Sequence, residues 1–125
     1  VDDCLMGEIY PQGMGRGLRR LAAYGKPLYV TENGVADQAD RLRPGFIVRH
    51  LTQVHSALAA GADVRGYFHW TLVDNFEWSD GWSLRFGVGA LESATQAIRP
   101  RPSAAVYERI CRANAIPAEL LAAYG

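Results

Sequence analysis

The stretch that decides the fold of this chain is Tyr29-Val30-Thr31-Glu32-Asn33-Gly34. Aromatic and β-branched residues favour a strand, which we predict over Leu28–Thr31. Asn-Gly is a turn pair, so the strand breaks directly after the carboxylate of Glu32. In α/β folds, catalytic and binding residues gather at the carboxyl ends of the strands. Glu32 is therefore the first candidate functional residue.

A second segment of the same kind follows the next predicted strand, Val64–Trp70. It reads His69-Trp70-Thr71-Leu72-Val73-Asp74-Asn75-Phe76-Glu77-Trp78, so it starts in the last two residues of that strand and continues into a long loop that we predict over 71–83. This combination of acidic and aromatic side chains suggests a site for a sugar. The two carboxylates and two indoles at or beyond the strand ends are Glu32, Glu77, Trp70 and Trp78.

Helices are predicted before, between and after the two strands. Pro44 opens the clearest one, and Gly61 ends it. Its apolar residues have the spacing of a single helical face; they are Ile47, Leu51, Val54 and Leu58. The other ranges are Pro11–Tyr24, Pro102–Asn114 and Pro117–Tyr124 as helices, and Leu84–Leu91 as partly extended chain.

Strands that alternate with helices of this length indicate βαβ units and a parallel sheet. Leu28 and Val64 begin the two strands, at a separation close to the roughly 31 residues per unit of a (β/α)8 barrel of about 250 residues. A parallel sheet needs cover on both faces, which two strands alone cannot provide. Either further strands have escaped recognition, or the chain is a piece of a larger fold.

The composition is that of a globular protein, with 125 residues, 49% hydrophobic and 21% charged. Thirteen basic and thirteen acidic residues leave no electrostatic argument for nucleic acid or an anionic membrane. No apolar run approaches the roughly 20 residues of a membrane span, and no signal peptide is visible. We therefore expect neither nucleic acid nor a membrane as a partner.

The two cysteines, Cys4 and Cys111, lie far apart and match no metal-binding or redox spacing. Reduced thiols explain them most simply, so we expect a cytoplasmic location. Nothing in the sequence calls for a cofactor, and none is expected. The chain has no initiating Met, which leaves room for residues upstream of Val1.

Several motifs, in this order, resemble the C-terminal part of the family 1 glycoside hydrolases, the β-glucosidase group. The matching motifs are Glu8-Ile9-Tyr10-Pro11-Gln12-Gly13, Thr31-Glu32-Asn33-Gly34, Trp70-Thr71-Leu72-Val73-Asp74-Asn75-Phe76-Glu77-Trp78, Arg85-Phe86-Gly87 and Arg101-Pro102-Ser103-Ala104. The resemblance covers nearly the whole chain, to about Ile116. The chain departs from the family's usual pattern at Met6-Gly7-Glu8, where Gly-Trp-Glu is common.

The family fold is a (β/α)8 barrel, and the matching stretch is its seventh and eighth β/α units. The resemblance therefore implies an α/β fold class, with residues 1–125 forming a single partial domain, the C-terminal portion of the barrel. About six strands would lie in an N-terminal portion that this chain lacks and that activity requires. This agrees with the βαβ units inferred from the residues.

By the same resemblance, Glu32 is the nucleophile of a retaining β-glycosidase. Such an enzyme hydrolyses the O-glycosidic bonds of β-glucosides or related sugars through a covalent intermediate. Glu77 would accept hydrogen bonds from sugar hydroxyls, Trp70 would offer an apolar platform and Trp78 an indole N–H. Phe86 matches a residue near the exocyclic hydroxymethyl group. The implied partner is a small-molecule β-glycoside.

Each of these side chains also has a plainer explanation. Glu32 would cap its turn or pair with Arg41, and Glu77 would pair with Arg85. Aromatic side chains most often pack in a core, and for Phe86 the two interpretations are equally good.

The histidines are interpreted without a catalytic or metal-binding role. His69 lies next to Trp70, and we interpret it as a strand histidine in the barrel wall rather than as a base. His50 and His55 lie five positions apart on one predicted helix, so they do not share a face and do not make a convincing metal pair.

The second catalytic carboxyl group of the family, the acid/base, lies in an Asn-Glu-Pro motif on an earlier strand, and no Asn-Glu-Pro occurs here. General acid assistance contributes about 10²- to 10⁴-fold. We therefore expect little or no turnover from the isolated chain, while its parent enzyme hydrolyses β-glycosides. Two alternatives stay open: a carbohydrate-binding homologue or fragment without catalysis, and a self-contained small α/β interaction domain.

Overall fold

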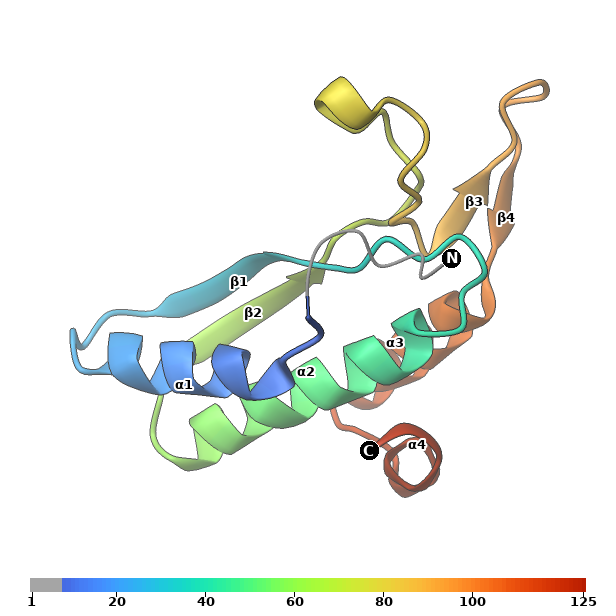
Figure 1. The fold of residues 1–125 in the computed structure, drawn as a ribbon. Helices are drawn as coiled ribbons and strands as arrows, with labels where there is room; N and C mark the ends of the chain where they lie inside the picture. The colour runs from blue at the N-terminus through green and yellow to red at the C-terminus, as the bar shows by residue number, and fades with distance from the viewer. Residues whose placement is uncertain (1–7) are drawn as a thin grey trace.

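The structure is a computed structural model that describes residues 8–125 (Figure 1). The predictions for Cys4 and for Met6-Gly7 lie outside these residues. In chain order the elements are α1 (Pro11–Ala22), β1 (Leu28–Asn33), α2 (Arg43–Ala59), β2 (Val64–His69), the short 3-10 helix η1 (Trp78–Asp80), β3 (Gly89–Leu91), β4 (Ile98–Pro100), α3 (Pro102–Ala113) and α4 (Ala118–Tyr124).

The first half of the chain contains the predicted βαβ unit. Strands β1 and β2 pair in parallel, with Val30 opposite Tyr67 and Asn33 opposite His69. Helix α2 connects them and lies beside α1 on one side of the sheet (Figure 1). Proline occupies the first turn of α1, α2 and α3, where its missing N–H leaves no hydrogen bond unmade.

Strand β1 is longer than predicted. It runs through Glu32 to Asn33, because the backbone N–H of Trp70 donates to the carbonyl of Asn33 at 3.0 Å and continues the contact between the strands. Strand β2 ends at His69, one residue earlier than predicted. Glu32 is therefore the second-last residue of β1 and does not belong to the loop that follows the strand.

The hairpin of β3 and β4 is a feature that the sequence patterns did not predict. The two strands pair antiparallel, with Gly89 opposite Pro100 and Leu91 opposite Ile98. Only the first of them falls within the stretch that was expected to be partly extended. Each strand has three residues, which is too short for an alternating pattern to be recognised.

The core lies between the helices and the sheet. One cluster of buried residues joins α2, α3 and α4, and a second joins α1, β1 and α2. The second cluster places Val30 on the helix side of β1. The predicted apolar face of α2 is thus partly buried, with Ile47 and Val54 inside and Leu58 44% exposed.

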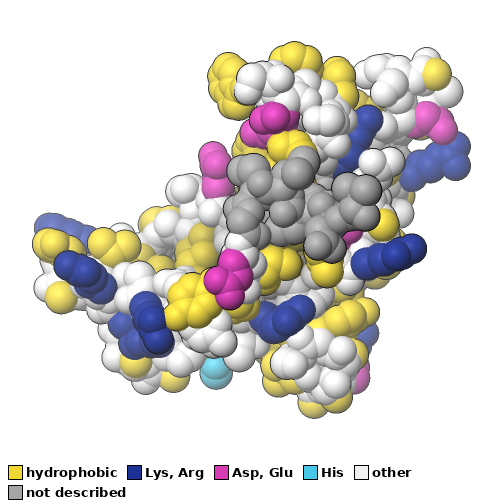
Figure 2. Space-filling view, in the orientation of Figure 1, with side chains coloured by type: hydrophobic (Ala, Val, Ile, Leu, Met, Phe, Trp, Pro, Cys, Tyr) yellow, Lys and Arg dark blue, Asp and Glu magenta, His cyan; other side chains and the backbone are white. Residues whose placement is uncertain are grey.

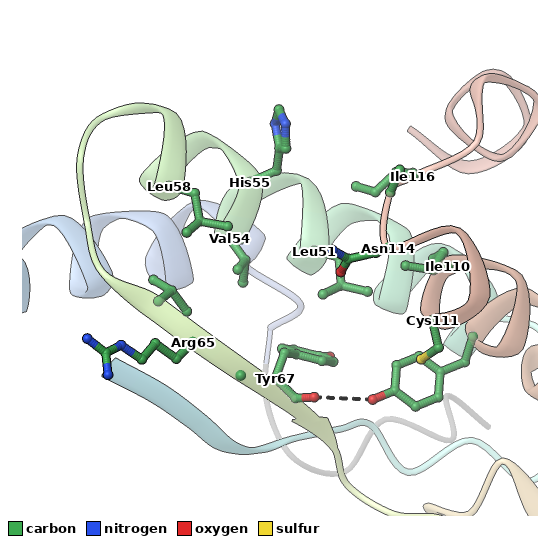
Figure 3. Close-up of a pocket in the computed structure, with 14 residues that line it drawn as sticks. Leu51, Val54, His55, Leu58, Arg65, Tyr67, Ile110, Cys111, Asn114 and Ile116 are labelled. Atoms are coloured by element: carbon green, nitrogen blue, oxygen red, sulfur yellow. Dashed lines mark hydrogen bonds between the residues drawn. The ribbon is translucent and has the colours of Figure 1, made fainter. Parts of the chain in front are cut away.

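A cavity of about 260 Å³ lies beside Leu58, between α2, β2 and α3 (Figure 3). Its walls are mostly apolar, and Tyr107 donates a hydrogen bond across it to the carbonyl of Tyr67 at 3.3 Å. Other side chains that line the cavity include Leu51, Val54, His55, Ile110 and Cys111. No helix of residues 8–125 is long and apolar enough to cross a membrane.

The face of the sheet that points away from the helices carries exposed aromatic side chains. Tyr29 of β1 and Phe68 of β2 are 55% and 58% exposed, although both belong to paired strands of a parallel sheet. No helix or strand of residues 8–125 covers this face (Figure 1). Because parallel sheets are normally covered on both faces, this open face indicates part of a larger structure.

Candidate active site

The structure brings the ends of β1 and β2 into direct contact. Besides the bond between Trp70 and Asn33, the hydroxyl of Tyr67 donates to the side-chain oxygen of Asn33 at 2.9 Å. A Cβ atom on Gly34 would lie 1.7 Å from the carbonyl oxygen of Trp70, so only glycine fits there. The two motifs that were singled out in the sequence therefore meet at one edge of the sheet.

Glu32 presents an exposed carboxylate at this edge. The predicted alternative, an ion pair between Glu32 and Arg41, is absent from residues 8–125. Asn33, the residue after Glu32, is held to the neighbouring strand by its hydrogen bonds with Trp70 and Tyr67. The end of β1 is therefore fixed, while the carboxylate of Glu32 stays accessible. That arrangement suits a carboxylate that must approach a bound molecule.

Trp70 and Phe86 belong to a small apolar cluster that backs the strand ends. Phe86 is 4% exposed and packs with Ala36 and Leu84, and half-buried Trp70 lies against them. The peptide bond between Trp70 and Thr71 is cis. Phe86 thus has the packing role that the sequence left as an equal alternative, and its contact with a sugar stays a prediction.

Residues 70–88 form the segment that we call the recognition loop. Near its tip, Asn75 donates to a carboxylate oxygen of Glu77 at 2.8 Å, and the backbone N–H of Glu77 donates to the carbonyl of Gly81 at 2.7 Å. Trp78 is 85% exposed. Figure 2 shows hydrophobic side chains gathered at this tip, at the top of the view.

The predicted alternative for Glu77, an ion pair with Arg85, is not what the structure shows. Arg85 instead lies 3.8 Å from the carboxylate of Asp74 and stacks over the ring of Trp82. Glu77 is satisfied by an amide within its own loop, which leaves its carboxylate without a cationic partner in residues 8–125.

Asp74 fixes the base of the recognition loop, and the sequence analysis gave it no role. It is 4% exposed and accepts two bonds from the guanidinium of Arg101, at 3.0 and 2.9 Å, and one from the backbone N–H of Gly87 at 3.0 Å. Burial alone would raise the pKa of Asp74, but the bonds from Arg101 and from the backbone outweigh it and lower that pKa.

A second buried polar group was also missed. Asp37, Asp40 and Arg43 are 1%, 7% and 0% exposed, and they lie where β1 connects to α2. Arg43 pairs with the carboxylate of Asp40. Burial lowers the pKa of Arg43, and the charge of Asp40 opposes that shift. In the sequence these residues resemble an ordinary polar loop, so no pattern could have identified them as buried.

The side chains of His50 and His69 pack among the helices rather than with the predicted site residues. His69 packs on the helix side of β2, with ring centroids 6.5 Å from Phe46 and 5.9 Å from Tyr107, as expected for a strand histidine. Burial and the nearby charge of Arg43 lower its pKa to about 4. His50 bonds the carbonyl of Phe46, and within residues 8–125 no group of acidic, histidine or cysteine side chains could hold a metal ion.

The large cavity of Figure 3 is separate from these motifs. It lies on the helix side of β2, and neither Glu32 nor Glu77 lines it. The sugar site that the sequence predicts around Glu32 and Glu77 is therefore not this cavity. The residues described contribute an open wall rather than an enclosed pocket, because the opposite face of the sheet is uncovered.

Comparison with known proteins identifies the fold and the family. The family model described as glycosyl hydrolase family 1 matches residues 5–116. The chain belongs to glycosyl hydrolase family 1. Among curated members of this family, a β-galactosidase of Sulfolobus acidocaldarius is 52% identical over 114 residues, and one of Saccharolobus solfataricus is 46% identical. Each match covers 90% of this chain and 23% of the relative.

Solved structures of the family agree with this assignment. The β-glycosidase from Pyrococcus horikoshii superposes with a TM-score of 0.94 at 46% identity, over 98% of this chain and 29% of that one. A β-glucosidase from Thermotoga maritima, solved in complex with glucoimidazole, gives 0.86 at 31% identity, over 92% and 29%. The chain thus spans about a quarter of its relatives' length and is a portion of a (β/α)8 barrel, as predicted.

Proposed function

We propose that this chain is the C-terminal portion of a retaining β-glycosidase and carries its nucleophile, Glu32. The observation that supports the proposal most strongly is the contact between the two strand ends. The exposed carboxylate of Glu32 comes one residue before Asn33, whose carbonyl accepts the N–H of Trp70, the residue directly after β2. A nucleophile needs a rigid support and an open approach, and the end of β1 offers both.

In the proposed reaction, a carboxylate oxygen of Glu32 attacks the anomeric carbon of a bound β-glycoside. The bond to the aglycone breaks, and an acid/base group outside this chain gives the leaving oxygen a proton. Water, deprotonated by that same group, then attacks the anomeric carbon and releases both the sugar and Glu32. Two displacements restore the β configuration. The acid/base would lie about 5–5.5 Å from Glu32.

The recognition loop would hold the sugar. Glu77, which has no cationic partner in the described residues, would accept bonds from sugar hydroxyls, and a charged acceptor makes these bonds about twice as strong as a neutral one. Trp70 would lie under the ring, and exposed Trp78 would add its indole N–H. Phe86 would act from behind Trp70, by supporting its position.

The substrates we propose are β-glucosides and β-galactosides, because the relatives are named β-galactosidase and β-glucosidase. The chain alone contains the nucleophile but not the acid/base. We therefore propose that it has little or no turnover without the remaining part of the barrel, which would also complete the sugar-binding wall.

A mechanism-based 2-deoxy-2-fluoro β-glycoside tests the nucleophile in the parent enzyme, meaning the complete barrel that includes this sequence. We expect a covalent label on the peptide that contains Glu32. Glu32→Ala should abolish turnover, and added azide should restore cleavage and give the α-glycosyl azide, because the anion attacks from the side that the carboxylate occupied. Glu92→Gln, at an exposed ion pair with Arg99, is the matched control and should keep full activity.

A label on any other peptide would refute the assignment of Glu32. Sugar binding without label and without turnover would favour the alternative, a carbohydrate-binding homologue. The two outcomes are separated by measuring binding of the unreactive sugar alongside the labelling.

A further inference from the structure

Two chain segments adjoin the proposed site, one that follows Glu32 and one at the end of the recognition loop, and one buried side chain joins them. The first segment, residues 34–42, connects β1 to α2 directly after Glu32. The second, residues 84–88, is the returning end of the recognition loop and includes Phe86. Arg43, the first residue of α2, lies between the two segments with 0% exposure.

The guanidinium of Arg43 donates to both segments at once. Its Nη2 atom donates to the carbonyl of Asp37 at 2.6 Å and to the carbonyl of Arg85 at 2.7 Å. The carbonyl of Arg85 also accepts the backbone N–H of Asp37 at 2.9 Å. The Nη1 atom pairs with the carboxylate of Asp40. A single planar cation thus adds a second link, beside the direct backbone bond, between two segments that are far apart in sequence.

The carboxylate of Asp40 extends the same connection to a third element. Its second oxygen accepts the backbone N–H of Ser103 at 2.7 Å, in the first turn of α3. Asp37 holds the other side of Arg43, because its carboxylate accepts the backbone N–H groups of Leu42 and Arg43 at 2.7 and 2.9 Å. Apart from the ion pair between Arg43 and Asp40, the side-chain bonds of this group are made to backbone at the start of α2 and α3 and in the two segments.

We propose that Arg43 is a positioning residue, which keeps the strand end that bears Glu32 in register with the recognition loop through its bonds to the carbonyls of Asp37 and Arg85. The proposal rests on the proposed function of Glu32. Arg43 touches no substrate in this scheme. Its effect on the reaction passes through the distance between the acid and the sugar that Trp70 and Glu77 hold.

The alternative is that Arg43 only stabilises the fold, and the substitution Arg43→Lys separates the two. An ammonium can still pair with Asp40, but it is a compact point charge without the planar fork that reaches both carbonyls. The fold should therefore survive while the two segments lose their fixed spacing. Arg49→Lys is the matched control, since Arg49 is an exposed arginine of the same helix whose one side-chain bond within residues 8–125 goes to the carbonyl of Gly45, one turn away, at 3.1 Å.

The experiment compares both variants with the unchanged parent enzyme. For Arg43→Lys we expect the rate of labelling by the 2-deoxy-2-fluoro glycoside, and kcat, to fall about 10- to 100-fold, as misplacement by about 1 Å can do, with KM changed less than about threefold. Amide hydrogen exchange should quicken in both 34–42 and 84–88. The Arg49→Lys variant should match the unchanged enzyme in every measurement.

The inference is overturned if folded Arg43→Lys keeps its labelling rate within about twofold, or if exchange quickens in neither segment or in one alone. A variant that loses activity only in proportion to its folded fraction also overturns it, because that loss is one of stability. If the unchanged enzyme carries no label on Glu32, the proposed function fails instead. Amide hydrogen exchange in residues 34–42 and 84–88 of Arg43→Lys then decides by itself whether Arg43 holds the two segments together.

Discussion

Gly34 has no room for a side chain, because the carbonyl oxygen of Trp70 occupies the place that a Cβ atom would take. Gly34 and Trp70 are close because the register of β1 and β2 puts Asn33 opposite His69. The residues that directly follow the two strands, Gly34 and Trp70, are therefore in contact. At the scale of single residues, the proposed site therefore depends on a glycine as much as on its acid. The Asn-Gly pair marked a turn in the sequence, but only the structure shows why the second residue is glycine.

Substitution of Gly34 by Ala should be severely destabilising in the parent enzyme. A Cβ 1.7 Å from a backbone oxygen forces one strand end to move, and overpacking typically costs about 1–3 kcal/mol or more. We expect a clear fall in the denaturant midpoint and loss of labelling at Glu32. Gly17→Ala is the control: it lies in α1 with no atom within 4 Å of the new Cβ and should stabilise by about 0.5–1 kcal/mol. Equal effects of the two substitutions would contradict the close approach.

At the scale of elements, α2 was predictable from its long apolar pattern, and β1 and β2 from short β-rich runs beside it. Pro44, the apolar spacing of α2 and Gly61 mark one helix, and the two β-rich runs mark the strands. The β3–β4 hairpin was not predictable, since three-residue strands have no pattern of their own. The burial of Arg43 and Asp74 was not predictable either, because charged residues are normally exposed. The bonds of Arg43 to the carbonyl of Arg85 and of Asp74 to Arg101 join residues that are far apart in sequence.

The packing of β2 against α2 and α3 makes the stability of these elements sensitive to acid. The folded state holds the pKa of His69 at about 4, below its ordinary value of 6.5, so folding favours the neutral ring. The resulting stability is complete above about pH 6.5 and is lost as the pH falls toward 4, by at most about 3 kcal/mol. The pKa of His50 is lowered by burial as well and adds in the same direction.

We therefore expect the free energy of unfolding of the parent enzyme to fall between pH 6.5 and 4, and to fall less steeply in His69→Phe. Denaturant unfolding at several pH values measures both slopes. His55→Phe, at an exposed position of α2, is the control and should keep the slope of the unchanged protein. An unchanged slope in His69→Phe would mean that the ring is already protonated, or freely solvated, in the folded state.

At the scale of the whole molecule, one face of the β1–β2 sheet is buried under helices and the other is exposed. Val30 is buried under the helices, while Tyr29 and Phe68 lie exposed on the opposite face. The sequence predicted this incompleteness from the need of a parallel sheet for two layers of cover, and the comparisons confirm that the chain covers about a quarter of its relatives.

The isolated chain should consequently associate through its open face. We expect Phe68→Ser to reduce self-association and the binding of a hydrophobic dye, with little change in the denaturant midpoint, because the ring is already 58% exposed. Val30→Ser, in the paired strand, is the control and should lower that midpoint strongly, as large-to-small changes in a core do. Sedimentation and dye fluorescence distinguish the two. If both substitutions lowered the midpoint equally, the face would be covered in the isolated chain.

The bond between Asp74 and the backbone of Gly87 closes the recognition loop at its base, while the tip is held by contacts of its own. The residues between Asp74 and Gly87 therefore form a loop whose two ends are held at a fixed distance. Under the proposed function, a different sugar preference could be sought by exchanging residues 75–83 with those of another family member, with Asp74, Gly87 and Arg101 left untouched. A graft that also replaced Asp74 or Gly87 would have to restore the buried ion pair between Asp74 and Arg101 at the base of the loop.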